Sequence, residues 1–126
     1  MKPADVEIWN RFIEKYPLAY DEVSYDFEIG HGPDFDTIVN AETGGDDLAL
    51  YQWKMDAVGY KGRRVDLIDV KPRAGLSAIG QAVCYELLWK RDFDPQGDDR
   101  AVIITDTLRP DIAYLCKKLG IDIFVV

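Results

Sequence analysis

The sequence predicts a single α/β domain, residues 1–126, in which helices flank a mixed central sheet. Two observations carry this prediction. Within 54–85, two strand-like runs surround a glycine-containing turn and a helical segment follows. Further on, the continuous apolar run at 101–105 is typical of a buried strand, and a helical segment and a second apolar run follow it. The expected order is therefore helix, three strands, helix, strand, helix and strand.

In the first part of the chain we expect a helix at 5–15, whose apolar residues Val6, Trp9, Phe12 and Ile13 form one stripe before Pro17. Residues 23–29 alternate between apolar and polar side chains, as in a strand with one wet face. The Gly- and Asp-rich stretch 30–47 is expected to be a long loop with a brief strand at 35–39.

The remaining elements follow the same rules. The final strand is expected to pair in parallel with 101–105 through a right-handed crossover. Pro110 at the first turn and Gly120 after the last turn delimit the last helix. The expected segments are a hairpin of 48–60 and 63–70, a helix at 74–91, a loop at 93–99, a strand at 101–105, a helix at 110–119 and a strand at 121–126.

Composition excludes several classes of protein. No run approaches the roughly 20 apolar residues that a membrane span needs. The amphipathic, acid-containing start of the chain does not resemble a signal peptide. Both cysteines, Cys84 and Cys116, fall on expected helices among apolar neighbours, so we expect buried thiols in a reducing, cytoplasmic compartment.

Asp69 and Lys71 should share one face of the second hairpin strand, because side chains alternate along a strand. The position of Asp56 depends on the turn. A two-residue turn at Lys61-Gly62, or a four-residue turn, places Asp56 opposite Leu67 and on the side of Asp69. A three-residue turn places it on the other side.

Two carboxylates that converge beside a lysine suggest metal chemistry. Like charges a few ångströms apart repel, and a divalent cation removes that conflict. Oxygen ligands suit Mg²⁺ or Mn²⁺. The lysine could then orient an attacking water or stabilise charge on a phosphate. The alternative is a surface ion pair of Lys71 with Asp69 on an ordinary hairpin.

The helix at 74–91 adds two polar side chains. Its polar face is expected at Glu86 and Lys90, with Ile79 between them. The apolar arc is expected to cover most of the remaining circumference and to include Leu76, Ala78, Ala82, Val83, Cys84, Leu87, Leu88 and Trp89. Gln81 and Tyr85, four residues apart, lie within the arc. We therefore expect Gln81 to point at the sheet, where a buried amide needs partners, unless it is simply a satisfied core residue.

The pattern Asp56…Asp69-Val70-Lys71…Gln81-Ala82-Val83-Cys84-Tyr85 resembles the PD-(D/E)xK nuclease superfamily, in particular its RecB-like and Cas4-like branch. The segment from Asp69 to Asp92 also resembles small phage and bacterial members of that superfamily. The resemblance covers residues 48–126. It implies a restriction-endonuclease-like αβββαβ core with an added C-terminal helix and strand. Met55 stands where the family has a proline before the first metal ligand.

The resemblance implies a function and a role for each matched residue. Asp56, Asp69 and the main-chain carbonyl of Val70 would hold Mg²⁺ or Mn²⁺. Lys71 would be the catalytic lysine, with Gln81 supporting the site. Tyr85 and Arg73 would contact the substrate. Further acids proposed for the site are Glu14 or Glu7 from the first helix and Glu28 from the first strand.

The implied activity is that of a metal-dependent DNA nuclease, working in a bacterial cell or, if phage-encoded, in its host's cytoplasm or in association with the virion. The net charge of −8 opposes general nucleic-acid binding, but six of the fifteen basic residues fall within 54–73. A domain this small often needs a homo-oligomer or a larger complex to hold its substrate. The alternative is a non-catalytic module that keeps the fold for binding or assembly.

Overall fold

The computed structural model describes residues 1–30, 53–93 and 98–126. The loop expected at 30–47 beyond residue 30, the brief strand at 35–39, the start of the hairpin at 48–52 and part of the loop at 93–99 lie outside the described residues. The elements are α1 (Pro3–Lys15), β1 (Glu22–Ile29), β2 (Trp53–Lys61), β3 (Arg64–Lys71), α3 (Leu76–Phe93), β4 (Asp98–Thr105), α4 (Pro110–Leu119) and β5 (Asp122–Val125).

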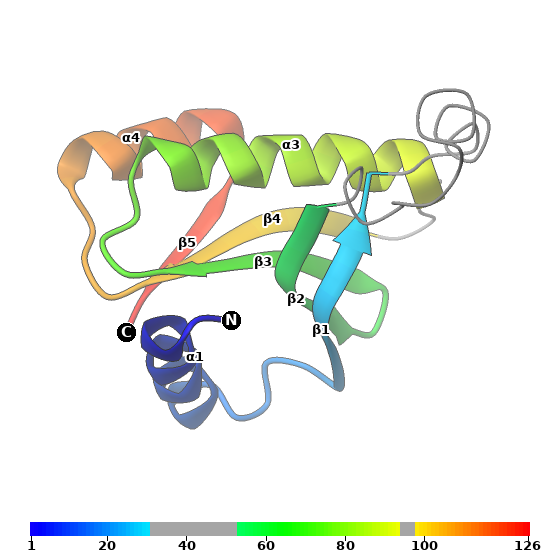
Figure 1. Ribbon diagram of the computed structural model, residues 1–126, viewed down its shortest axis with the longest axis horizontal. Helices are drawn as coiled ribbons and strands as arrows, with labels where there is room; N and C mark the ends of the chain where they lie inside the picture. The colour runs from blue at the N-terminus through cyan, green and yellow to red at the C-terminus, as the bar shows by residue number, and fades with distance from the viewer. Residues whose placement is uncertain (31–52, 94–97) are drawn as a thin grey trace, which may run out of the picture.

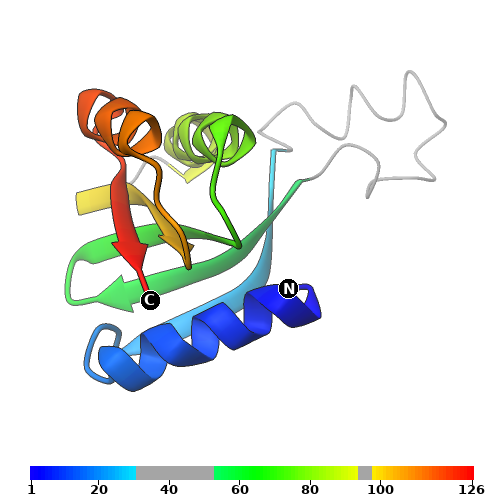
Figure 2. The same cartoon turned by 90° about the vertical axis from the view of Figure 1, so that its left-hand side faces the viewer.

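The described strands form one five-stranded mixed sheet in the order β1-β2-β3-β4-β5. β1, β2 and β3 pair antiparallel, whereas β3, β4 and β5 pair in parallel. α1 covers one face of the sheet, and α3 and α4 lie together on the other (Figures 1 and 2). The expected order of elements and the parallel pairing of the last strand are confirmed.

The α1 helix begins two residues earlier than expected because Pro3 fits the first helical turn and Asp5 accepts a hydrogen bond from the Lys2 main-chain N–H (3.1 Å). It buries Ile8, Trp9 and Phe12 against the sheet. The predicted stripe was partly wrong, because Ile8 is buried and Val6 is 40% exposed.

The hairpin turn lies at Gly62-Arg63, one residue later than the two-residue turn that we expected. Lys61 pairs with Arg64, and Gly62 has a φ of +57°, which favours glycine at the first position of such a turn. Leu67 therefore faces Val58 rather than Asp56. The shift is by two residues, so it leaves Asp56 on the expected side.

Strand β2 changes face at Asp56. Met55 packs on the face of the sheet that α3 covers, and Ala57 packs on the opposite face, which α1 covers. Val58 packs again on the α3 face. Neighbouring β1 is distorted at the same level: Asp26 has a φ of +50°, and neither Asp26 nor Asp56 belongs to the β1–β2 ladder. The β2–β3 ladder likewise extends only as far as the pair of Ala57 and Ile68. This irregularity frees the Asp56 carboxylate from the regular alternation.

The α3 helix buries only part of the apolar arc that we predicted. Its buried residues are Ala78, Ile79, Ala82, Tyr85 and Trp89. Leu76 and Leu87 are instead 71% and 63% exposed. Cys84 is also exposed, which corrects the expectation of a buried thiol, whereas Cys116 is buried. The helix therefore presents an apolar surface to solvent.

On the α1 side of the sheet, Asp66 is completely buried and holds three elements together. It accepts a hydrogen bond from Tyr20 Oη (2.7 Å) and two from Arg100 Nε and Nη2 (2.7 and 3.0 Å), and Arg64 Nε lies 3.3 Å from it. Gly59 leaves the space that the Tyr20 ring fills, since a Cβ there would lie 2.5 Å from the ring. This network anchors the α1–β1 connection to β3 and β4.

Candidate active site

A cavity of about 520 Å³ lies where β2 and β3 separate, between the first turn of α1 and the middle of α3. We call it the acidic cavity. It is lined by Met1, Lys2, Ala4, Asp5, Lys54, Asp56, Asp69, Val70, Lys71, Pro72, Gln81 and Tyr85. The structure thus brings together five of the side chains that the sequence singled out, from two strands and a helix.

Asp56 reaches across from β2 to β3. Its Oδ2 accepts a hydrogen bond from the Val70 main-chain N–H at 2.8 Å. This donor lies on β3 beyond the pair of Ala57 and Ile68, the last backbone pair of the β2–β3 ladder. This contact places Asp56 beside Asp69, the residue that precedes Val70. The role of the Val70 carbonyl as a metal ligand stays a prediction.

Asp69 is only 6% exposed, and its buried Oδ2 has no hydrogen-bond partner among the described residues. Burial, followed by the negative charge of Asp56, raises the pKa of Asp69 to about 7. Lys71 opposes this shift, and a hydrogen bond with Asp56 adds to it. Lys71 is half-buried and lines the same cavity. The repulsion of Asp69 by Asp56 thus outweighs its attraction to Lys71.

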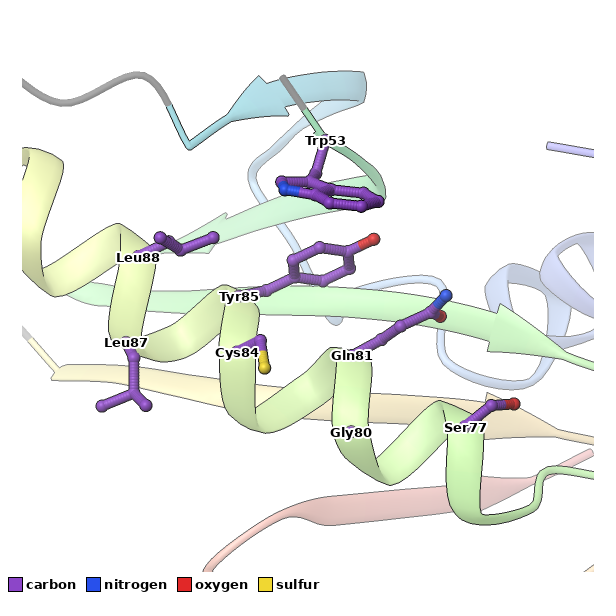
Figure 3. A pocket seen from close by; sticks show the side chains of 8 residues that line it. All are labelled: Trp53, Ser77, Gly80, Gln81, Cys84, Tyr85, Leu87 and Leu88. Atoms are coloured by element: carbon purple, nitrogen blue, oxygen red, sulfur yellow. The ribbon is translucent and has the colours of Figure 1, made fainter. Parts of the chain in front are cut away.

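Gln81 and Tyr85 extend from neighbouring turns of α3 toward the same side of the helix (Figure 3). Tyr85 Oη donates a hydrogen bond to the Lys54 carbonyl at 3.3 Å. Burial and the charges of Asp69 and Asp56 raise the pKa of Tyr85, so its hydroxyl stays protonated at neutral pH. Gln81 is half-buried and lines the cavity, instead of being a buried core amide as expected.

The sequence did not single out three further charged residues of the cavity, Lys2, Asp5 and Lys54. Lys54 lies on the same strand as Asp56, two residues before it, and this spacing could have indicated a further charge at the site. Lys2 and Asp5 reach the cavity because the first turn of α1 packs beside the ends of β2 and β3, which no local pattern indicates.

The other predicted residues lie outside the acidic cavity. Arg73 is exposed at the turn after β3, where its main-chain N–H donates to Asp106 Oδ1 (2.8 Å). Glu14 and Glu7 on α1 are exposed, as is Glu28 on β1. Among the described residues, Asp5 is therefore the first-helix acid that reaches the cavity.

The donor set fits a hard divalent cation. Mg²⁺ is held by one or two carboxylates and keeps several waters, and Asp56 and Asp69 supply two carboxylates with one unpartnered oxygen. Within the described ranges no group of three or more His, Cys, Asp or Glu side chains is arranged to hold a metal. The fit is thus to an ion that relies on water for most of its ligands.

Comparisons with protein-family models, curated proteins and solved structures find no match. In the part of the chain that the structure describes, no helix is long and apolar enough to cross a membrane. The chemistry of the acidic cavity and the motif in the sequence therefore carry the functional proposal.

Replacing Asp69 by asparagine should stabilise the metal-free protein, and increasingly so as the pH rises. A carboxyl whose folded pKa is raised favours the folded state below its unfolded pKa, near 3.8, and loses that contribution as the pH rises through about 7. Relative to Asp69→Asn, the wild type should lose up to roughly 4 kcal/mol between about pH 4 and pH 8.

Urea denaturation in EDTA across this range measures the difference. Asp98→Asn, which changes an exposed carboxyl on β4, is the matched control and should give a nearly constant difference. A wild type that becomes more stable than Asp69→Asn at high pH would show that Asp69 is a structural acceptor.

Proposed function

We propose that the chain is a metal-dependent nuclease that hydrolyses phosphodiester bonds in DNA, built on a restriction-endonuclease-like αβββαβ core. The observation that carries the proposal is the convergence of Asp56, Asp69 and Lys71 in one cavity. A purely structural ion pair does not need the second carboxylate, because Lys71 alone would neutralise Asp69. The β2 irregularity that brings Asp56 to this point is better explained by a binding site.

Asp56 and Asp69 would hold Mg²⁺ or Mn²⁺, with the Val70 carbonyl as a further ligand by resemblance. When bound, such an ion supplies Lewis-acid stabilisation for the negative charge that develops on the scissile phosphate. The hydrogen bond from the Val70 N–H fixes Asp56 Oδ2 and so orients the rest of its carboxylate. A bound ion would give the unpartnered Asp69 Oδ2 a partner.

The chain's own groups would position the substrate and the water. Lys71 is a fixed positive charge in a partly buried site, where it can orient the attacking water or stabilise the phosphate in the transition state. The amide of Gln81 can donate to a phosphate oxygen. Tyr85 keeps its proton and holds the Lys54 main chain at the cavity wall.

Local charge supports a phosphate substrate despite the overall charge of −8. Three lysines, Lys2, Lys54 and Lys71, line the acidic cavity together with three aspartates. The charges of these described side chains therefore cancel, and a bound divalent cation would make this set net positive. Phosphodiester backbones are drawn to such a site, most strongly at low salt.

We expect one Mn²⁺ or Mg²⁺ ion to bind per chain at up to about millimolar concentration and to raise the melting temperature, because the ion binds the folded state only. Isothermal titration calorimetry of the wild type beside Asp69→Asn measures this. The variant removes one ligand charge while it keeps the shape of the side chain, so binding should be lost.

Asp98→Asn again controls for the loss of one negative charge on the surface. Equal binding by all three proteins would place the ion elsewhere. A wild type that binds no divalent cation would remove the metal centre from the proposal.

A further inference from the structure

A second pocket, of about 590 Å³, adjoins the acidic cavity, and the two share Gln81 and Tyr85 in their walls. Figure 3 shows its other main walls: Trp53 from β2, and Cys84, Leu87 and Leu88 from α3. We call it the apolar pocket. Its volume falls in the range of small-molecule sites.

The lining of the apolar pocket is exposed although it is apolar. Trp53 and Leu87 are each 63% exposed, and Cys84, which lines the same pocket, is also exposed. Large apolar side chains that gather at one hollow on a surface mark a binding site more often than isolated ones do. An occupant would cover an indole ring and a leucine that the described fold leaves in water.

The chemistry of the two neighbouring spaces differs. Among the described residues, no Asp, Glu, Lys or Arg lines the apolar pocket, whereas six charged side chains line the acidic cavity. The first suits a flat, uncharged group, and the second suits a phosphate. A nucleotide carries both groups on one sugar. Bases stack on aromatic side chains largely regardless of sequence, and the Trp53 indole offers such a face.

We propose that the apolar pocket receives an unstacked base of a single DNA strand whose scissile phosphate lies in the acidic cavity. This inference rests on the proposed function, since it assigns the substrate of the same site. Gln81, on the wall between the two spaces, can hydrogen-bond to the edge of the base. A paired base inside a duplex cannot enter, so single strands and frayed ends are the preferred substrates.

The test measures binding apart from cleavage. Fluorescence anisotropy of a labelled single-stranded oligonucleotide, first in EDTA and then in Ca²⁺, compares the wild type with Trp53→Ala and Trp53→Phe. Losing one stacked base should weaken binding by about 5- to 150-fold, and phenylalanine should restore most of it. Leu119→Ser, which alters a leucine that is 50% exposed on α4, is the matched surface control and should bind like the wild type.

Alkylation of Cys84 with a bulky maleimide gives a second test in the unmutated chain, because Cys116 is buried. Modified wild type should lose single-strand binding relative to the untreated protein, whereas the same treatment should cause no further change in Cys84→Ser. Unchanged binding after both the Trp53→Ala substitution and the Cys84 modification would overturn the inference. So would self-association of the chain that Leu87→Ser abolishes while DNA binding persists.

Failure of the proposed function has a separate signature, namely no cleavage of any DNA by the wild type in Mg²⁺ or Mn²⁺. Single-strand binding that depends on Trp53 without cleavage would support the base pocket and remove the nuclease. If Trp53→Ala changes neither cleavage nor single-strand binding, the nuclease is supported and the base pocket is overturned.

Discussion

Replacing Lys71 by alanine should lower the rate of DNA cleavage by about 10²–10⁴-fold, the usual effect of removing one electrostatic or proton-transfer group. Lys71 is half-buried and lines the cavity with Asp56 and Asp69. Its charge should act mainly on the transition state, so kcat should fall far more than KM rises. Folding should change little, because no hydrogen bond or ion pair of the described residues depends on the Lys71 ammonium.

Two variants control this experiment. Lys117→Ala removes the same charge from the exposed surface of α4 and should cleave at the wild-type rate. Lys71→Arg keeps the charge in a different shape and should recover only part of the activity. If Lys71→Ala instead weakens DNA binding modestly and lowers the salt dependence by about one unit, Lys71 is a phosphate contact and not a catalytic group.

Replacing Asp66 by alanine should be the most destabilising single change on the α1 side of the sheet. Asp66 is 0% exposed and is the shared acceptor of Tyr20 and Arg100. Its removal takes the buried acceptor away from Tyr20 and Arg100, although Arg100 keeps its pair with Asp122. Breaking a buried pair costs about 3–5 kcal/mol, and the lower end applies because Arg64 and Arg100 remain a third exposed. The melting temperature should fall on the order of 10 °C.

Asp122→Ala is the matched control because Asp122 also pairs with Arg100 but is half-exposed. It should cost less than about 1 kcal/mol. Urea denaturation measures both values. Similar small losses for the two variants would mean that Arg100 and Tyr20 rehydrate freely and that the network does not anchor the fold.

Much of the fold follows from sequence because the relevant signals are local. Proline at the start of α4, glycine after it and the apolar run of β4 determine those elements by short-range sterics and burial. The sequence predicts the hairpin turn one residue earlier than the structure has it. The expected side of Asp56 does not change, because a register shift of two residues keeps side chains on the same face of a strand.

The manner in which Asp56 reaches Asp69 could not be predicted. Regular alternation would put Met55 and Ala57 on one face, yet they pack on opposite faces. The irregularity involves Asp26 on the neighbouring strand, so it depends on the pairing of β1 with β2. Asp66 and Asp69 look alike in the sequence, but the odd spacing between them sends one to the network below α1 and the other to the cavity.

Only part of the buried face of α3 is predicted correctly, for a related reason. The helix is apolar on most of its circumference, so periodicity alone cannot choose which arc is buried. Packing against the sheet and α4 selects Ile79 and leaves Leu76, Cys84 and Leu87 in solvent. Of these three residues, Cys84 and Leu87 form part of the wall of the proposed base pocket.

The most direct test of the nuclease is cleavage of labelled DNA by the wild type, with Lys71→Ala purified in parallel. The panel contains a single strand, a duplex and a branched substrate, each with Mg²⁺, with Mn²⁺ and with EDTA. We predict cleavage that requires a divalent ion, favours the single strand and falls by about 10²-fold or more in Lys71→Ala. No cleavage of any substrate by the wild type, or equal cleavage by the two proteins, would contradict the assignment of Asp56, Asp69 and Lys71 as a nuclease site.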